Sequence, residues 1–230
     1  MLKQISLFNL STQEIKDVEN EGEILASIDS IYIVKCYSSF KQDDNLNIIM
    51  EYCDAGDLSQ FLKISQQSGR FVSEEKIWKY FIQMCLGLAH IHCKKILHRD
   101  IKSMNMFMTK EDKIKIGDLG VAKVLMQTQF AKTFVGTPYY LSPEICEEKP
   151  YNDKSDIWAL GCILYEMCTY KHPFNATNQA ALILKILKGK FDPIPKEYTQ
   201  DLRKIIELIM QKNYYKRPNV FDLLTNSSKL

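Results

Sequence analysis

The chain has 230 residues, 46% hydrophobic and 25% charged, which suits one large globular domain or two small lobes around a sizeable core. Its formal net charge of +2 argues against a strongly basic nucleic-acid-binding or membrane-binding protein, so we predict neither partner. The sequence has no apolar run of about 18 residues and no basic start followed by an apolar segment, so it predicts neither a membrane span nor a signal peptide.

The first 53 residues show a mixture of strand and helix patterns. Leu2–Ile5 alternates and predicts a short strand. Ser11 followed by Glu14 is a capping box, which predicts a helix that runs to about residue 28. Two more strands are predicted at Ile33–Phe40 and Leu46–Tyr52, on either side of a turn-prone Asp-Asp-Asn sequence.

From Asp54 onward the pattern is mainly helical. Ser73 is expected to cap a long helix, with Glu74 and Glu75 well placed in its first turn. Residues Ser155–Thr169 are apolar almost all round, which predicts a helix buried in the middle of a lobe. Further helices are predicted at 57–63, 179–188, 200–211 and 220–224, with short strands and loops over 96–143.

The change from strands to helices predicts two lobes joined by a hinge near residues 51–56. We expect an α+β fold in which residues 1–53 form a small sheet with one helix and residues 54–230 form a mainly helical lobe. Ligand sites are common in clefts between lobes, so the hinge is a candidate binding region.

The seven cysteines are odd in number, form no Cys-x-x-Cys pair and lie mostly in apolar runs. This distribution predicts reduced thiols rather than disulfides. His90, His92 and Cys93 lie close together within one helical pattern, but no second group of ligands accompanies them, so a metal site there is disfavoured.

The run His98–Asn105 places an acid, a cation and an amide at fixed offsets. Asp100 is the candidate base, which would accept or orient the proton of an incoming hydroxyl, and Lys102 can neutralise a phosphoryl group in transfer. Asn105 offers an amide oxygen and Asp118 a carboxylate, and Mg²⁺ prefers oxygen ligands of this kind. The sequence therefore supplies residue types that are suited to magnesium-dependent phosphoryl transfer.

Three motifs in order resemble the signature of eukaryotic protein kinases. The run His98–Asn105 is followed by Asp118–Gly120, which starts 18 positions after Asp100 (118 minus 100), and then by Ser142–Glu144. Lys102 resembles the lysine of serine/threonine kinases rather than tyrosine kinases. The resemblance implies a two-lobed α+β kinase fold, with ATP and Mg²⁺ as cofactors and a protein as substrate.

The stretches 130–146, 154–162 and 171–174 are similar to the NIMA-related kinases in particular. Carried onto matching positions, the resemblance implies that Thr137 supports the substrate hydroxyl together with Asp100 and Lys102. It also implies structural contacts in the helical lobe. Glu144 would pair with Arg217, and Asp156 would hold the backbone of the loop that contains Asp100.

Thr133 resembles an activation-loop phosphorylation site, where Arg99 and Lys123 could pair with the phosphate. The alternative is an unmodified loop threonine. Glu166 also attracts attention as an acidic residue near the end of a buried helix, but too many ordinary roles are open to it for an assignment.

Lys3 is the candidate ligand of the α- and β-phosphates, if a carboxylate of the first helix orients it. Glu21 is the preferred candidate for that carboxylate, and Glu23 is the alternative. A solvated lysine near the chain start is the other interpretation of Lys3.

The predicted hinge supplies candidate contacts for adenine. The carbonyl of Glu51 and the N–H of Cys53 would bind the adenine edge, Met50 would set the depth of the pocket, and Phe107 would belong to its floor. Asp57 could bond the ribose hydroxyls or simply cap the helix that starts there, and the sequence favours neither role.

The chain departs from the family pattern at its start, because only Met1 and Leu2 precede Lys3 and the nine glycines form no Gly-x-Gly-x-x-Gly sequence. We therefore expect a truncated sheet in the first lobe, phosphates without a covering loop, and an exposed edge at Leu2–Ile5. Because the residues expected of the second lobe are complete, we interpret the sequence as lacking an N-terminal segment.

These observations predict a serine/threonine protein kinase that transfers the γ-phosphate of ATP. The alternative is a kinase-fold binding module that transfers little or no phosphate, because the glycine-rich loop is absent. The resemblance also implies a cytoplasmic location, with the cytoskeleton or the cilium as further family locations.

Overall fold

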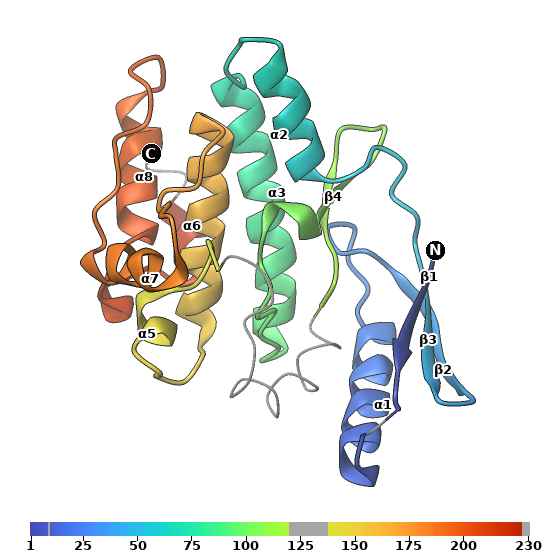
Figure 1. Ribbon diagram of the computed structural model, residues 1–230. Helices are drawn as coiled ribbons and strands as arrows, with labels where there is room; N and C mark the ends of the chain where they lie inside the picture. The colour runs from blue at the N-terminus through green and yellow to red at the C-terminus, as the bar shows by residue number, and fades with distance from the viewer. Residues whose placement is uncertain (9, 120–137, 227–230) are drawn as a thin grey trace.

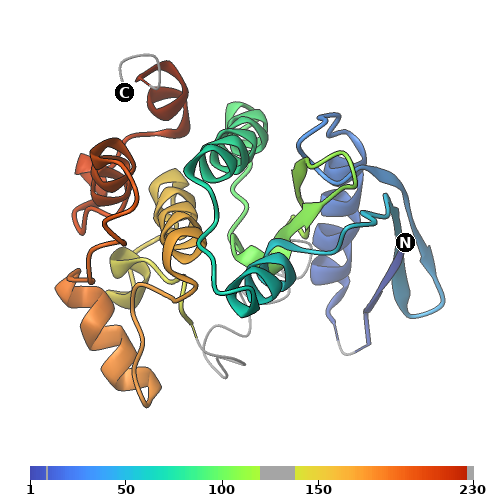
Figure 2. The same ribbon diagram turned by 90° about the horizontal axis from the view of Figure 1, so that it is seen from above.

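The structure is a computed structural model, which describes residues 1–8, 10–119 and 138–226, apart from the side chains of Asp17, Glu21 and Asn226 (Figure 1). A small sheet with one helix lies at one side of the molecule, and a larger group of helices lies at the other (Figures 1 and 2). The predicted α+β fold with a small sheet and a mainly helical second lobe is confirmed.

The first lobe contains three antiparallel strands and a helix. The elements are β1 (Leu2–Ser6), α1 (Thr12–Ala26), β2 (Cys36–Gln42) and β3 (Asn45–Met50). The strand order is β1-β3-β2, so β3 is the central strand. Its residue Ile48 pairs with Lys3 of β1 on one side and with Ser39 of β2 on the other. The predicted capping box is present, since Ser11 and Glu14 bond each other's backbone at the start of α1. This sheet places Lys3 on an edge strand, next to the second lobe.

The predicted strand from Ile33 starts later, at Cys36, because the residues before it pair with another part of the chain. The N–H of Val34 donates to the carbonyl of Ile116 at 2.9 Å, and the N–H of Ile116 donates to the carbonyl of Tyr32 at 2.8 Å. Ile116 belongs to β5 (Ile114–Ile116), which pairs with β4 (Met106–Met108) as a hairpin. These bonds fasten the small sheet to the hairpin that carries the candidate site.

The second lobe is mainly helical, and its helices are grouped around α6 (Figure 2). They are α2 (Leu58–Gln67), α3 (Glu74–Cys93), α5 (Pro143–Cys146), α6 (Asp153–Thr169), α7 (Gln179–Lys188), α8 (Gln200–Ile209) and α9 (Val220–Asn226). Every residue from Ser155 to Cys168 is buried, as the apolar pattern predicts. Burial on all sides makes α6 the fixed support of this lobe.

Two helix starts differ from the prediction. The hydroxyl of Ser73 makes no capping bond at the start of α3. Instead, the neighbouring Glu74 accepts a hydrogen bond from the backbone of Thr199 at 2.8 Å, which ties that end of the helix to the chain before α8. Helix α6 begins at Asp153 rather than Ser155, because Asn152 is the cap and Ser155 completes a capping box with it.

The sheet ends at Met50 and α2 begins at Leu58, so the change from strands to helices falls within residues 51–57. A domain boundary after residue 53 stays a prediction.

Among the described helices, none has the length and apolar character needed to cross a membrane.

All seven cysteines are free, and they differ in environment. Cys93 is exposed, whereas burial and the charge of Glu51 raise the pKa of Cys53 to about 11. Thiols react as thiolates, so the raised pKa leaves Cys53 with much less reactive thiolate near neutral pH than an ordinary cysteine has.

We therefore expect iodoacetamide to alkylate Cys93 well before Cys53 in the folded protein. Peptide mass spectrometry over a time course measures both rates, and the same reaction in urea is the control, where the two rates should converge. Equal rates in the folded protein would contradict the placement of Cys53.

Candidate active site

Asp118 lies just after β5 and carries a salt bridge to the first strand. Its φ of 55° is in the left-handed region, which is uncommon for a residue with a side chain. Its Oδ1 atom accepts a hydrogen bond from Lys3 Nζ at 2.7 Å. The two side chains are 35% and 31% exposed, so the pair is open to a ligand from solvent.

Lys3 is therefore held by Asp118 and is not a freely solvated lysine. The predicted partner Glu21 lies in α1, but its side chain is outside the described part of the structure, and no contact joins Lys3 to Glu23 among the described residues. Lys3, Met50 and Asp118 line one small cavity of about 20 Å³ behind this salt bridge. The role of Met50 in limiting the depth of an adenine pocket stays a prediction.

The run His98–Asn105, called the 98–105 loop below, brings its three candidate residues together. Lys102 Nζ lies 2.9 Å from Asp100 Oδ2. Asn105 Nδ2 donates to the same oxygen at 2.9 Å and to the backbone carbonyl of Asp100 at 2.8 Å. A turn of 3₁₀ helix over Ser103–Asn105 produces this arrangement by folding the amide back toward Asp100.

His98 connects this loop to the residue before Asp118. The N–H of Asp100 donates to His98 Nδ1 at 3.1 Å, so this ring nitrogen is the acceptor. His98 Nε2 therefore carries the proton and donates to the carbonyl of Gly117 at 3.0 Å. The N–H of Gly117 in turn donates to the carbonyl of Asn105 at 2.9 Å. The loop and Asp118 are thus joined through buried contacts at Gly117.

Asp156 holds the backbone of the 98–105 loop from α6. Its two carboxylate oxygens accept the N–H groups of His98 and Arg99, each at 3.0 Å. His92 Nε2 lies 2.8 Å from Oδ2, and the hydroxyl of Tyr151 donates to Oδ1. Burial acts to raise the pKa of Asp156, but these neighbours hold it below its ordinary value. The carboxylate therefore stays ionised and keeps the loop backbone in place.

Two of these partners could not be predicted from the sequence. His92 contacts Asp156 across 64 positions of sequence, and Tyr151 has no pattern that distinguishes it from a core aromatic residue. His92 had attracted attention only as a disfavoured metal ligand. Its place beside Asp156 accounts for a histidine on the inner side of α3.

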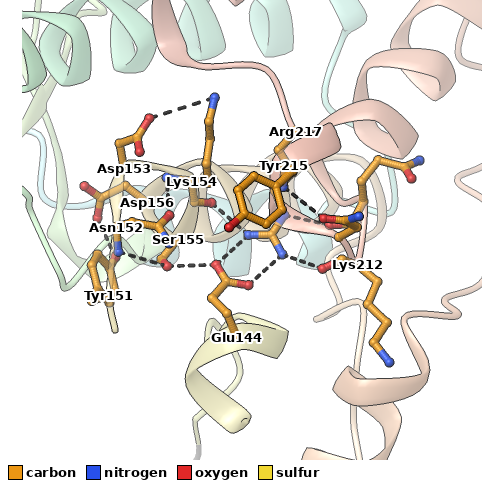
Figure 3. Close-up of polar contacts among 12 residues, drawn as sticks. Glu144, Tyr151, Asn152, Asp153, Lys154, Ser155, Asp156, Lys212, Tyr215 and Arg217 are labelled. Carbon is orange, nitrogen blue, oxygen red and sulfur yellow. Dashed lines mark hydrogen bonds and ion pairs between the residues drawn. The ribbon is translucent and has the colours of Figure 1, made fainter. Parts of the chain in front are cut away.

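Glu144 and Arg217 form a buried ion pair between α5 and the chain before α9 (Figure 3). Two guanidinium nitrogens of Arg217 donate to the two carboxylate oxygens at 2.7 and 2.8 Å. The remaining donors bind the backbone carbonyls of Gln211, Lys154 and Lys212 at 2.6, 2.9 and 3.1 Å. All five N–H groups of Arg217 are therefore used, which offsets the cost of burying its charge.

The hinge residues lie between the lobes. The carboxylate of Glu51 is bound to Lys115 Nζ at 2.6 Å, and the N–H of Glu51 donates to the carbonyl of Lys35 at 2.8 Å. Among the described residues, no bond occupies the carbonyl of Glu51 or the N–H of Cys53. The two backbone groups expected to bind adenine are thus open.

Asp57 caps α2, since its carboxylate accepts the backbone N–H of Gln60 at 3.0 Å and the side-chain amide of Gln60 at 2.7 Å. A role toward ribose stays a prediction. Phe107 forms an antiparallel bridge with Asp57, and its ring lies against Gly117, where an added Cβ would be 2.5 Å from the ring. Close packing of this ring therefore requires glycine before Asp118.

Thr133 and Thr137 lie outside the described residues, as does Lys123, so their predicted roles stay predictions. Arg99, the expected phosphate partner, has a φ of 65° and donates its backbone N–H to Asp156. Of the predicted site residues, the structure brings together Asp100, Lys102 and Asn105 as one group and Lys3 with Asp118 as another.

Comparison with known proteins agrees with this geometry. Residues 1–227 match the family described as protein kinase domain. Serine/threonine-protein kinases Nek1 and Nek5 of Mus musculus are each 47% identical over 97% of this chain, which covers 18% and 35% of their own lengths. Serine/threonine-protein kinase Nek3 of Mus musculus is 46% identical over 99% of this chain, which covers 44% of it. The chain thus spans less than half of each of these relatives.

Proposed function

Because this chain belongs to the protein kinase family and is of the NIMA-related type, we propose that it transfers the γ-phosphate of ATP to serine or threonine hydroxyls of a protein. The observation that carries the proposal is the group formed by Asp100, Lys102 and Asn105, whose side chains meet at one carboxylate oxygen. A positioned carboxylate beside a cation is what transfer to a hydroxyl requires.

In this proposal Asp100 accepts or orients the hydroxyl proton. Lys102 and Asn105 donate to the same oxygen of Asp100, at 2.9 Å each, and therefore restrict the carboxylate to one orientation. The ammonium of Lys102 also places a positive charge where the phosphoryl group would pass. The structure thus supports a role for these residues in alignment and charge compensation.

The oxygen groups at the site fit Mg²⁺. The amide nitrogen of Asn105 faces Asp100, which leaves its oxygen as a potential ligand, and Asp118 adds a carboxylate. Asn105 and Asp118 would hold the ion, which when bound compensates phosphate charge. Lys3, whose Nζ atom is 2.7 Å from Asp118, would contact the phosphates of the same nucleotide.

The nucleotide base would bind at the hinge, where the open carbonyl of Glu51 and N–H of Cys53 offer an acceptor and a donor. No observation favours the alternative of a binding module without transfer. The relatives that match nearly all of this chain are named serine/threonine-protein kinases. A protein substrate and a cytoplasmic location remain parts of the proposal.

The nucleotide site is tested with a thermal-shift titration. We expect Mg-ADP to raise the Tm of the chain, because a ligand that binds only the folded state stabilises it, by about 2.7 kcal/mol at about 100 times Kd. Asp118→Asn should lose the part of the shift that depends on Mg²⁺, since the substitution removes a carboxylate ligand.

Asp112→Asn is the matched control, because Asp112 also has a positive φ, of 57°, and also pairs with lysines, at 2.6 and 3.2 Å. It lies in the turn between β4 and β5, away from the proposed ligands. An Mg²⁺-dependent shift in Asp118→Asn that equals that of Asp112→Asn would refute the metal role of Asp118.

A further inference from the structure

Glu166, near the end of α6, is joined to the 98–105 loop by two hydroxyl groups. The hydroxyl of Ser103 donates to Glu166 Oε1 at 3.1 Å, and that of Tyr140 donates to Oε2 at 2.6 Å. The two hydroxyl oxygens are themselves 3.0 Å apart. The three side chains therefore form a closed triangle of polar contacts, called the Ser103 bridge below.

The bridge connects three separate parts of the fold. Ser103 follows Lys102 directly and begins the 3₁₀ turn that carries Asn105. Tyr140 lies just before α5, and Glu166 belongs to the central helix α6. The loop is thus fixed to α6 at two places, through Asp156 at its start and through Glu166 at Ser103.

The bridge lies in a poorly solvated region, where each hydroxyl matters. Ser103 is 2% exposed and Glu166 is 9% exposed. Burial raises the pKa of Glu166, while the bonds from Tyr140 and Ser103 act to lower it. Among the described residues, no lysine or arginine pairs with this carboxyl group. His172 packs edge-on against Tyr140, and burial lowers the pKa of that imidazole, so it brings no charge.

We propose that Ser103 is a positioning residue, whose bond to Glu166 holds Lys102 and Asn105 in line with Asp100. The turn of Ser103–Asn105 is closed by the N–H of Asn105, which donates to the carbonyl of Lys102 at 2.9 Å. Movement at Ser103 therefore moves both neighbours that bind Asp100. The proposal rests on the proposed function for its effect on transfer, but the bridge itself is measured without transfer.

Hydrogen exchange followed by mass spectrometry tests the bridge directly. Ser103→Ala removes one hydroxyl, and Tyr140→Phe removes the other while keeping the ring. Each should speed exchange in peptides that cover residues 98–106 by about tenfold or more, since the loop then opens more often. The second variant keeps the test decisive if the first fails to fold.

Ser155→Ala is the matched control. Ser155 is also 2% exposed and also donates to a buried glutamate, Glu144, at 2.8 Å, but it lies outside the 98–105 loop. Loop exchange that is unchanged in Ser103→Ala and Tyr140→Phe, or that rises equally in Ser155→Ala, would overturn the proposal.

Kinetics separate positioning from general stability. We expect Ser103→Ala to lower kcat about tenfold or more with little change in the KM for ATP, and Ser155→Ala to keep kcat even where its Tm falls. An unchanged kcat in Ser103→Ala would refute the positioning role. If the unaltered chain transfers no phosphate to any protein substrate, the proposed function fails, while the exchange experiment still decides whether the bridge holds the loop.

Discussion

Asp100→Asn is expected to lower kcat about 10²- to 10⁴-fold, the range typical for removal of a positioned acid or base. The asparagine has nearly the same shape, so Lys102 and Asn105 keep a polar neighbour, but the group can no longer take a proton. The KM for ATP and the Mg-ADP thermal shift should stay close to those of the unaltered chain. Phosphate incorporation into a model protein substrate, with ATP and Mg²⁺, measures the change.

Asp201→Asn is the control for the loss of one carboxylate. Asp201 lies on α8 and pairs with a neighbouring lysine, Lys204, at 3.3 Å on the surface. Its substitution removes the same charge without touching the 98–105 loop, so kcat should not change. If Asp100→Asn transferred phosphate as fast as Asp201→Asn, Asp100 would not be the base.

Elements formed by neighbouring residues were the ones that could be predicted. Helix α7 has the predicted bounds, Gln179–Lys188, because its pattern and its ends are local. The 98–105 loop was recognisable because Asp100, Lys102 and Asn105 lie within six positions of one another and fold onto themselves. Local spacing was therefore enough to predict both helix α7 and the centre of the candidate site.

Contacts between distant residues were harder to predict. Lys3 and Asp118 are 115 positions apart, and no local pattern indicates that they meet. The predicted partner of Lys3, Glu21, stays a prediction, because its side chain lies outside the described part of the structure. Ser103 and Glu166 are 63 positions apart, and neither residue type indicates that the two would meet. The contact of Ser103 with Glu166 depends on how α6 packs against the 98–105 loop, and hydrophobic periodicity does not reveal that packing. The pair Glu144 and Arg217 was predicted, but from family resemblance rather than from spacing.

The choice of helix cap was also hard to predict from the sequence. Ser73 stands at the position of a helix cap without making the capping bond, whereas Asn152, three residues before the start of the predicted helix, makes it. Serine and asparagine are both good caps, so residue type alone does not show which of the two forms the capping bond.

Arg217→Ala is expected to destabilise the fold by about 3–5 kcal/mol, because it leaves the buried carboxylate of Glu144 without its partner. Three backbone carbonyls also lose a donor, and the contact of the guanidinium with the Trp158 ring, at 4.8 Å, is removed. For a chain of this size the Tm should fall by roughly 6–20 °C. Urea unfolding at neutral pH and thermal unfolding measure the loss.

The pH dependence of the stability tests whether the ion pair of Glu144 and Arg217 causes this loss of stability. Burial acts to raise the pKa of Glu144, but the bonds and charge of Arg217 hold it below its ordinary value of 4.5. The unfolded chain then binds the proton more readily than the folded one, so the stability from this pair is present above pH 4.5 and is lost as the pH falls through the lower folded pKa. Glu144→Gln should remove that part of the acid dependence while keeping the side-chain shape.

Arg217→Lys has three donors in place of five, so its stability should lie between that of the unaltered chain and that of Arg217→Ala. A lysine variant as stable as the unaltered chain would show that the five bonds of the guanidinium are not needed.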